Sequence, residues 1–323
     1  LNTLLGLNYK YIPLEGLNLH YGSGFYYISA PVEYIVNLFF NLDYISSESK
    51  KILLTHPTVF IFFITSGIYL RKILYIITKN KDYSSISTFL YLSYPYLLGH
   101  SFFNTKDIPF LTVWLICTFY IIKISKYFYK NKIIKNKYFF ILSILSAFLL
   151  SIRISGILIF FEYLIFFIFT INILNFSYLN FFKLFYKKIA LFFLATLFLF
   201  YLLSPTYWAN PLEMINGLKS MSQHIQTVCT LTLGECMKAQ SLPSSYLPIW
   251  LIFKLPLIIL FGLTLLIFKE KIFFSSTNNS LVVAPMILST LLIIFFLILF
   301  NVNLYDELRQ VMFVIPLFFI TAM

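Results

Sequence analysis

The stretch "KDIPFLTVWLICTFYIIKISKYFYKNKIIKNK" (residues 106–137) combines the two features that decide the fold. Residues 110–122 form an apolar run, and the following segment, 123–137, holds six lysines and no acidic residue. Apolar runs that approach the ~20 residues needed to cross a hydrocarbon core are typical of membrane helices. Lysine-rich connections mark the cytoplasmic ends of such helices. The stretch therefore predicts a transmembrane helix that ends in the cytoplasm.

The composition extends this prediction to the whole chain. Of its 323 residues 60% are hydrophobic and only 11% are charged, whereas about 25% of residues are charged in soluble domains. We therefore expect an all-α, polytopic integral membrane protein with about nine transmembrane helices in a lipid bilayer. The predicted runs lie at residues 52–70, 84–99, 110–122, 138–152, 155–174, 189–204, 249–268, 280–300 and 311–323.

The connections between these runs alternate in charge. Four of them carry four, six, three and two Lys or Arg, at 71–81, 123–137, 175–188 and 269–279. The other connections, with Arg153 and Lys254, hold nine basic and nine acidic residues. By the positive-inside rule the first set faces the cytoplasm and the second set faces outward. The net charge of +12 is thus a topology signal, and nucleic-acid binding is not needed to explain it.

The predicted organisation is an external loop followed by a transmembrane domain. Residues 1–51 form the loop, and within it "FYYISAPVEYIVNLFFNL" (25–42) has an apolar face typical of an amphipathic helix in the membrane interface. Residues 52–323 form the multi-helix domain, with a long external segment at 205–248. Since an external loop precedes the first run and the chain stops within the last one, we expect a fragment whose upstream helix is missing.

Polar side chains gather in the external segment "HSFFNTKDIPF" (100–110). Asp107 has three interpretations: a helix cap ahead of Pro109, a ligand for a divalent cation (Mg²⁺ or Mn²⁺), or an acid/base carboxylate. Lys106 either extends its ammonium group to lipid headgroups or faces a phosphate as a point charge. His100 and Asn104 add polar contacts.

Three further basic residues lie at the external ends of apolar runs. Arg153 of "SIRISGILIF" either reaches external headgroups or neutralises an anionic lipid headgroup. Lys254 of "LPSSYLPIWLIFKLP" reaches headgroups or meets a lipid phosphate. Arg309 of "NLYDELRQVMFVIP" either pairs with Asp306, three residues earlier, or binds two phosphate oxygens with its guanidinium fork.

The remaining polar signals are weaker. Cys229 and Cys236 flank "TLTLGE" and form a hairpin disulfide or remain two free thiols. Trp208 ends an apolar run and is either part of the interfacial aromatic belt or a lining residue of the site. Glu162 lies inside an apolar run, and we interpret it as a structural partner rather than a catalyst.

Five of these segments, in this order, resemble the bacterial relatives of dolichyl-phosphate-mannose protein mannosyltransferases, which belong to the GT-C class of polytopic glycosyltransferases. The segments are "HSFFNTKDIPF", "RISGILIF", "PTYWANPLE", "LPSSYLPIWLIFKLPL" and "LYDELRQVMFVIP". The resemblance extends over nearly the whole chain, from "LHYGSGFYYISA" (19–30) onward, and "HSFFNTKDIPF" and "LYDELRQ" are its most specific pieces.

The resemblance implies a membrane glycosyltransferase that moves a sugar from a polyprenyl-phosphate donor to a protein, lipid or glycan acceptor, with inversion. It places the active face on the periplasmic side of a bacterial inner membrane. It implies a catalytic acid in the first external loop and a second acid at the position of Asp107. Glu15 and Glu33 lie early enough to be the first-loop acid, although this acid is expected upstream of Leu1.

The site residues predicted on this basis fall into two further groups. The donor phosphate is assigned to basic side chains: Lys106, Arg153, Lys254 and Arg309. The substrate pocket is assigned to polar and aromatic side chains: His20, His100, Asn104, Trp208, Tyr246, Tyr305 and Asp306. Two alternatives remain open, a transporter or flippase of a lipid-linked sugar and a polysaccharide polymerase or ligase.

Overall fold

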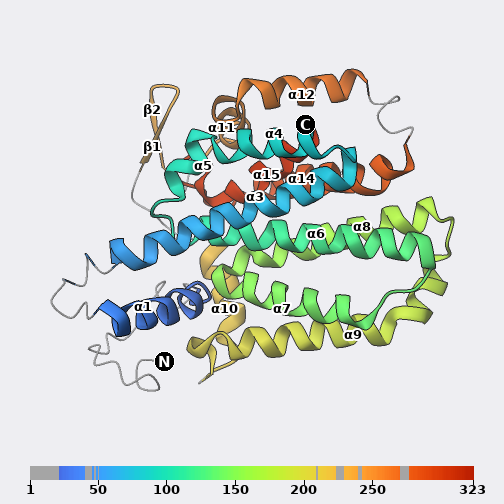
Figure 1. Ribbon diagram of the computed structural model, residues 1–323, viewed down its shortest axis with the longest axis horizontal. Helices are drawn as coiled ribbons and strands as arrows, with labels where there is room; N and C mark the ends of the chain where they lie inside the picture. The colour runs from blue at the N-terminus through green and yellow to red at the C-terminus, as the bar shows by residue number, and fades with distance from the viewer. Residues whose placement is uncertain are drawn as a thin grey trace.

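The computed structural model describes residues 22–40, 46, 49, 51–208, 210–222, 229–238, 242–269 and 276–323. Within these residues the chain is a helical bundle with one small β-hairpin, as predicted for the all-α class (Figure 1). The α-helices are α1 (Tyr26–Phe40), α3 (His56–Thr78), α4 (Lys81–Leu92), α5 (Pro95–His100), α6 (Asp107–Asn131), α7 (Asn136–Ile152), α8 (Ile159–Ile173), α9 (Tyr178–Leu202), α10 (Glu213–Ser222), α11 (Tyr246–Lys254), α12 (Leu257–Phe268), α14 (Thr277–Leu299) and α15 (Ile315–Ala322).

Shorter elements connect these helices. A π-helical segment, η3 (Lys51–Thr55), leads into α3, and 3-10 helices precede α8, follow α9 and precede α15. They are η4 (Ile154–Leu158), η5 (Pro205–Tyr207) and η7 (Arg309–Val314). The hairpin pairs β1 (Cys229–Thr232) with β2 (Glu235–Lys238) in antiparallel register, with Leu231 opposite Cys236.

Helix α6 is the centre of the bundle and packs against α3, α7, α8 and η7. Most of its apolar part is buried, and large side chains such as Trp114 and Phe128 are fully buried, as expected for a helix surrounded by other helices. Asn104 Oδ1 accepts the N–H groups of Lys106 at 3.3 Å and Asp107 at 2.9 Å. Asn104 thus accepts the N–H groups of the N-cap residue, Lys106, and of the first helical residue, Asp107, and the Asp107 carboxylate does not cap α6 as one interpretation of the sequence expected.

Five helices of the described residues are long and apolar enough to cross a membrane, which fits a membrane protein. They are Ile52–Thr78, Asp107–Asn131, Ile154–Ile173, Tyr178–Leu202 and Thr277–Leu299. A sixth span is obtained if α11 and α12 are counted together, so the predicted number of about nine is not confirmed. The predicted run at 84–99 is divided between α4 and α5 ahead of Pro95, and α7 has only 17 residues.

The predicted run at 249–268 is not one straight helix. Helices α11 and α12 meet at an angle of 112°. Leu255 is extended (ψ 137°) immediately before Pro256, because a proline ring disfavours helical geometry in the residue that precedes it. Lys254 thus occupies the last turn of α11, next to a sharp bend, rather than the interior of a span.

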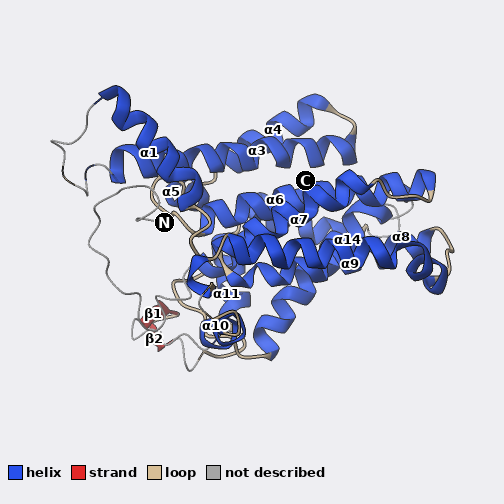
Figure 2. Cartoon of the chain, turned by 90° about the horizontal axis from the view of Figure 1, so that it is seen from below, coloured by secondary structure: helices blue, strands red, loops and turns tan. Residues whose placement is uncertain are grey.

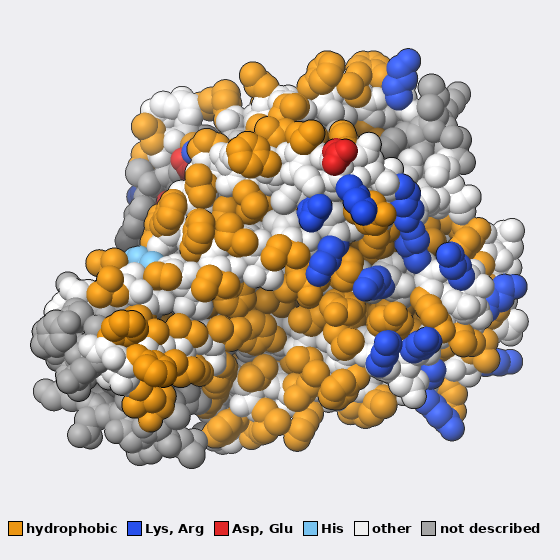
Figure 3. Space-filling model, viewed as in Figure 1, with side chains coloured by type: hydrophobic (Ala, Val, Ile, Leu, Met, Phe, Trp, Pro, Cys, Tyr) orange, Lys and Arg blue, Asp and Glu red, His pale blue; other side chains and the backbone are white. Residues whose placement is uncertain are grey.

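The two ends of the bundle differ in charge. Lysine and arginine side chains gather over the ends of α3, α6 and α9 that carry the α3–α4, α6–α7 and α8–α9 connections, on the right in Figure 3. The hairpin, α1, α5 and α10 lie at the opposite end in both ribbon views (Figures 1 and 2). This separation is the arrangement that the alternating charge pattern predicts for helices that run back and forth.

Candidate functional site

The carboxyl group of Asp107 forms the centre of a polar cluster at the end opposite the lysine-rich turns. Arg153 Nη1 forms an ion pair with Oδ1, and Arg309 Nε lies 3.0 Å from Oδ2. Asn104 Nδ2 also donates to Oδ2, at 2.9 Å. The side chain of Asp107 is only 4% exposed, so a nearly buried carboxylate holds two arginines from distant parts of the chain.

Local backbone geometry brings Arg153 to this position. Arg153 ends α7 in an extended conformation (φ −149°, ψ 134°), and η4 follows immediately. The N-terminal segment packs against the same turn, because Gly24 N donates to Ser151 O at 2.8 Å. A Cβ atom on Gly24 would lie 2.3 Å from Ser151 Oγ, so the close approach requires glycine.

Arg309 connects the cluster to the loop before η7. Its Nη1 atom lies 2.7 Å from Asp306 Oδ2, which is the pairing that the three-residue spacing predicted. Asp306 and Glu307 both have positive φ, 62° and 61°, a conformation that costs a non-glycine residue about 1–2 kcal/mol. The Asp306 N–H donates to Thr230 Oγ1 of the hairpin at 3.1 Å, so contacts with other elements hold the strained loop in place.

Glu307 joins Lys254 to the same loop. Lys254 Nζ lies 2.6 Å from Glu307 Oε2, and the Glu307 N–H donates to the hydroxyl oxygen of Tyr246 at 3.1 Å. The ammonium group of Lys254 also lies 5.2 Å from the ring centroids of Tyr96 and Trp250, within cation–π range. The structure therefore places Lys254, Tyr246 and Asp306 around one loop.

Burial and neighbouring charges change the protonation of Lys106. Burial, with Arg153 and Arg309 nearby, lowers the pKa of Lys106 to about 8, although Asp107 opposes this shift. Burial also lowers the pKa of His100, against the attraction of Asp107. His100 belongs to the cluster through Asn104, since His100 Nδ1 and Asn104 Nδ2 are 3.2 Å apart.

Tyr96 presents a hydroxyl group with unused hydrogen-bonding capacity. Its Oη atom is buried and has no hydrogen-bond partner among the described residues. Burial raises the pKa of Tyr96, and so do the charges of Glu307, Asp107 and Asp306, so the hydroxyl stays protonated among these carboxylates. A buried hydroxyl without a partner is costly, so the Tyr96 hydroxyl is a polar group of this region whose hydrogen bonding is not satisfied by the described residues.

The other predicted residues have different outcomes. Tyr305 lies in the strained loop beside Asp306. Trp208 is half exposed after α9, where its Nε1 donates to Tyr201 O at 2.8 Å, so its hydrogen bonds among the described residues are local and not with the polar cluster. Glu15 and His20 lie outside the described residues.

The predicted disulfide is described at one of its two cysteines. Cys236 is disulfide-bonded and Cys117 is free. The side chain of Cys229 is not described, so the pairing of Cys229 with Cys236 stays a prediction.

The role of Asp107 as a ligand for Mg²⁺ or Mn²⁺ stays a prediction. Both carboxylate oxygens face guanidinium groups, and the part of the chain that the structure describes has no group of three or more His, Cys, Asp and Glu arranged to hold a metal ion. Hard divalent cations require several oxygen ligands. In this structure the negative charge of Asp107 is balanced by the side chains of Arg153 and Arg309.

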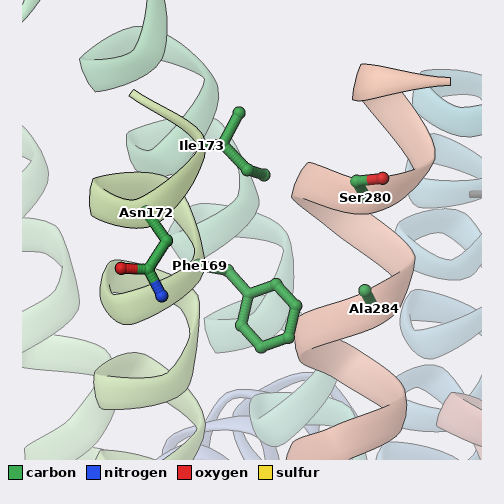
Figure 4. A pocket seen from close by; sticks show the side chains of 5 residues that line it. All are labelled: Phe169, Asn172, Ile173, Ser280 and Ala284. Carbon is green, nitrogen blue, oxygen red and sulfur yellow. The ribbon is translucent and has the colours of Figure 1, made fainter. Parts of the chain in front are cut away.

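Two of the cavities among the described residues lie outside the polar cluster around Asp107. The larger, about 440 Å³, separates α8 from α14 near the lysine-rich end and is lined by Phe169, Asn172, Ile173, Ser280 and Ala284 (Figure 4). The smaller, about 230 Å³, lies between the start of α11 and the end of α14 and includes Tyr246 in its wall. Only the smaller cavity shares a residue with the candidate site.

The predicted site residues did not include Glu307, Tyr96, Trp250 or Phe110, whose ring centroid lies 5.9 Å from the guanidinium carbon of Arg153. Glu307 is adjacent to Asp306, and Trp250 and Tyr96 each lie four residues before a predicted site residue, Lys254 and His100. On a helix this spacing brings side chains together, so a systematic search at four-residue spacing would have found both aromatic residues.

Comparisons with protein families, curated proteins and solved structures found no match to the chain.

Proposed function

We propose that the chain is a membrane glycosyltransferase that moves a sugar from a polyprenyl-phosphate donor to an acceptor on the external face of a bacterial inner membrane. The proposal includes about nine transmembrane helices and the sidedness set by the lysine-rich turns. The observation that supports it most directly is the cluster in which Arg153 and Arg309 form ion pairs with Asp107, at the end opposite those turns. The resemblance of the same segments to GT-C enzymes supports it.

The chemistry requires cations where the phosphate leaves. The acceptor hydroxyl oxygen attacks the anomeric carbon, the bond from this carbon to the phosphate oxygen breaks, and the phosphate keeps the electron pair. Fixed positive groups stabilise this developing charge best when they are oriented before the reaction. The guanidinium groups of Arg153 and Arg309, with the ammonium groups of Lys106 and Lys254, provide such charge, and the Tyr96 hydroxyl adds a donor.

The role of Asp107 follows from its contacts. Both of its oxygens are engaged by arginine and asparagine donors, so we propose that Asp107 orients the two arginines. The proton of the acceptor hydroxyl then passes to another carboxylate, and Glu15, the first-loop candidate, lies outside the described residues.

The test measures release of polyprenyl phosphate by the purified chain in nanodiscs, using a panel of polyprenyl-phosphate hexoses and pentoses. We expect Arg153→Ala and Arg309→Ala each to lower the rate by about 10²–10³-fold. The control is Arg71→Ala, because Arg71 lies in α3 and donates to Ser85 on α4, away from the cluster. Loss of release in the control, or full release in both cluster variants, would refute the assignment.

The same assay separates the alternatives. A flippase would move the intact lipid-linked sugar across the bilayer without releasing polyprenyl phosphate. A polymerase or ligase would consume a preassembled glycan on its lipid carrier and ignore the single sugars of the panel.

A further inference from the structure

Glu162 is a buried carboxyl group in α8 that the candidate site does not include. It is fully buried, and its Oε2 atom accepts the indole N–H of Trp114 at 2.7 Å. None of the ion pairs among the described residues includes Glu162. An ionisable residue inside a membrane helix is expensive to maintain, so its contact with Trp114 needs an explanation.

Trp114 belongs to an aromatic cluster that we define as Phe110, Trp114 and Phe313. The ring centroids of Trp114 and Phe313 are 4.2 Å apart, and Phe110 lies 5.8 Å from Trp114 and 5.4 Å from Phe313. All three side chains are buried. Rings packed this closely constrain one another, because protein interiors have little free volume.

One arginine of the candidate site, Arg153, lies against this aromatic cluster, and the other, Arg309, is joined to it through the backbone of η7. The Arg153 guanidinium carbon lies 5.9 Å from the Phe110 ring centroid. Arg309 and Phe313 lie in the same short segment, η7, which is kinked at Val311 (φ −112°, ψ 16°), so Phe313 is linked to Arg309 through a short stretch of backbone. Side-chain contacts thus lead from Glu162 to Arg153, and the backbone of η7 completes the connection to Arg309.

We infer that Glu162 is a positioning residue of this site. By fixing the indole of Trp114, Glu162 holds Phe313 and η7 in the position in which Arg309 and Arg153 both form ion pairs with Asp107. The inference rests on the proposed function for the meaning of the site. Its physical basis is that a buried indole N–H needs an acceptor. When the acceptor is absent, the ring turns or admits water, and the packed neighbours move with it.

The experiment uses the full chain in nanodiscs and compares three variants at two positions. Glu162→Leu removes the acceptor, Glu162→Gln keeps an acceptor oxygen, and Trp114→Phe removes the donor. The readouts are the indole N–H signature in ultraviolet resonance Raman spectra, hydrogen–deuterium exchange of the segment 304–316, and binding of a polyprenyl monophosphate that carries no sugar. The matched control is Tyr163→Phe, which breaks a buried hydrogen bond of the neighbouring residue to Ser146, 3.0 Å long, outside the aromatic cluster.

We expect Glu162→Leu and Trp114→Phe to raise exchange in 304–316 and to weaken phosphate binding, each on the order of tenfold. Glu162→Gln should stay within about twofold of the wild type and preserve the Raman signature, and Tyr163→Phe should leave exchange and binding unchanged. The double variant Glu162→Leu/Trp114→Phe should bind the phosphate no more weakly than either single variant and should show no greater exchange in 304–316. Both substitutions interrupt the same set of contacts, so their effects should not add.

Unchanged exchange of 304–316 in Glu162→Leu would overturn the inference, as would additive effects in the double variant or an equal loss in Tyr163→Phe. The exchange and Raman readouts need no ligand. A wild-type chain that transfers no sugar but shows the expected exchange pattern would therefore refute the proposed function and leave the positioning role intact.

Discussion

Arg309 Nε lies 3.0 Å from Asp107 Oδ2, although the two residues are 202 positions apart in the chain. Asp107 starts α6 and Arg309 starts η7, so this contact brings the beginnings of two distant elements to the same end of the bundle. Any membrane orientation that exposes one of these residues on the outside exposes the other there as well. The contact therefore joins two of the predicted external segments into one site.

We predict that Asp107→Asn abolishes sugar transfer and lowers the free energy of unfolding by about 1–3 kcal/mol, because two partly buried arginines lose their shared carboxylate. The measurement is unfolding by SDS titration in mixed micelles, together with the transfer assay. Asp306→Asn is the matched control: its side chain is 54% exposed, so we expect a change of at most about 0.5–1 kcal/mol. Equal destabilisation by the two variants would contradict the structure.

We predict that Tyr96→Phe leaves stability unchanged or slightly raised, while it weakens binding of the polyprenyl phosphate by about five- to tenfold. The hydroxyl has no partner among the described residues, so its removal costs the folded protein nothing, whereas a ligand would lose a hydrogen bond. Tyr91→Phe is the comparison, since Tyr91 Oη is bonded to Ser66 Oγ at 2.9 Å. This comparison variant should lose stability and keep affinity.

Phosphate binding should fall as the pH rises through about 8, where Lys106 loses its proton. His100 does not add to this dependence, because burial lowers its pKa and it is already neutral there. A phosphate monoester is fully ionised in this range, since its second pKa is about 6. Lys106→Arg keeps its charge and should remove the decline, and Lys106→Ala should bind weakly from pH 7 to 9.5. A decline that persists in Lys106→Arg would assign the titration to another group.

Sidedness can be measured with single cysteines and a membrane-impermeant maleimide on intact cells. We expect Phe103→Cys to react, because it is exposed in the segment before α6, and Lys132→Cys, in the exposed lysine-rich turn after α6, to react only after permeabilisation. Native Cys117 is buried and Cys236 is disulfide-bonded. The wild-type chain, which also contains Cys229, is labelled in parallel, and its signal is subtracted as the background. Reaction of both variants in intact cells would refute the proposed topology.

Several features of the site were open to sequence reasoning because they depend on residues close in the chain. The pairing of Asp306 with Arg309 follows from a three-residue spacing, and Asn104, His100 and Asp107 lie within eight positions of one another. The two arginine contacts of Asp107 could not be predicted from the sequence. Its two arginine partners come from 46 and 202 positions away, and no local pattern identifies such partners.

The sequence by itself determined that this is a helical membrane protein with lysine-rich turns on one side, because apolar run length and the Lys/Arg bias are local properties that composition records directly. Only the tertiary structure decided which helices are long enough to span, where the run at 249–268 bends, and which charges meet. Those outcomes depend on packing between residues far apart in the chain, where the partner of a buried carboxylate is chosen by geometry rather than by sequence spacing.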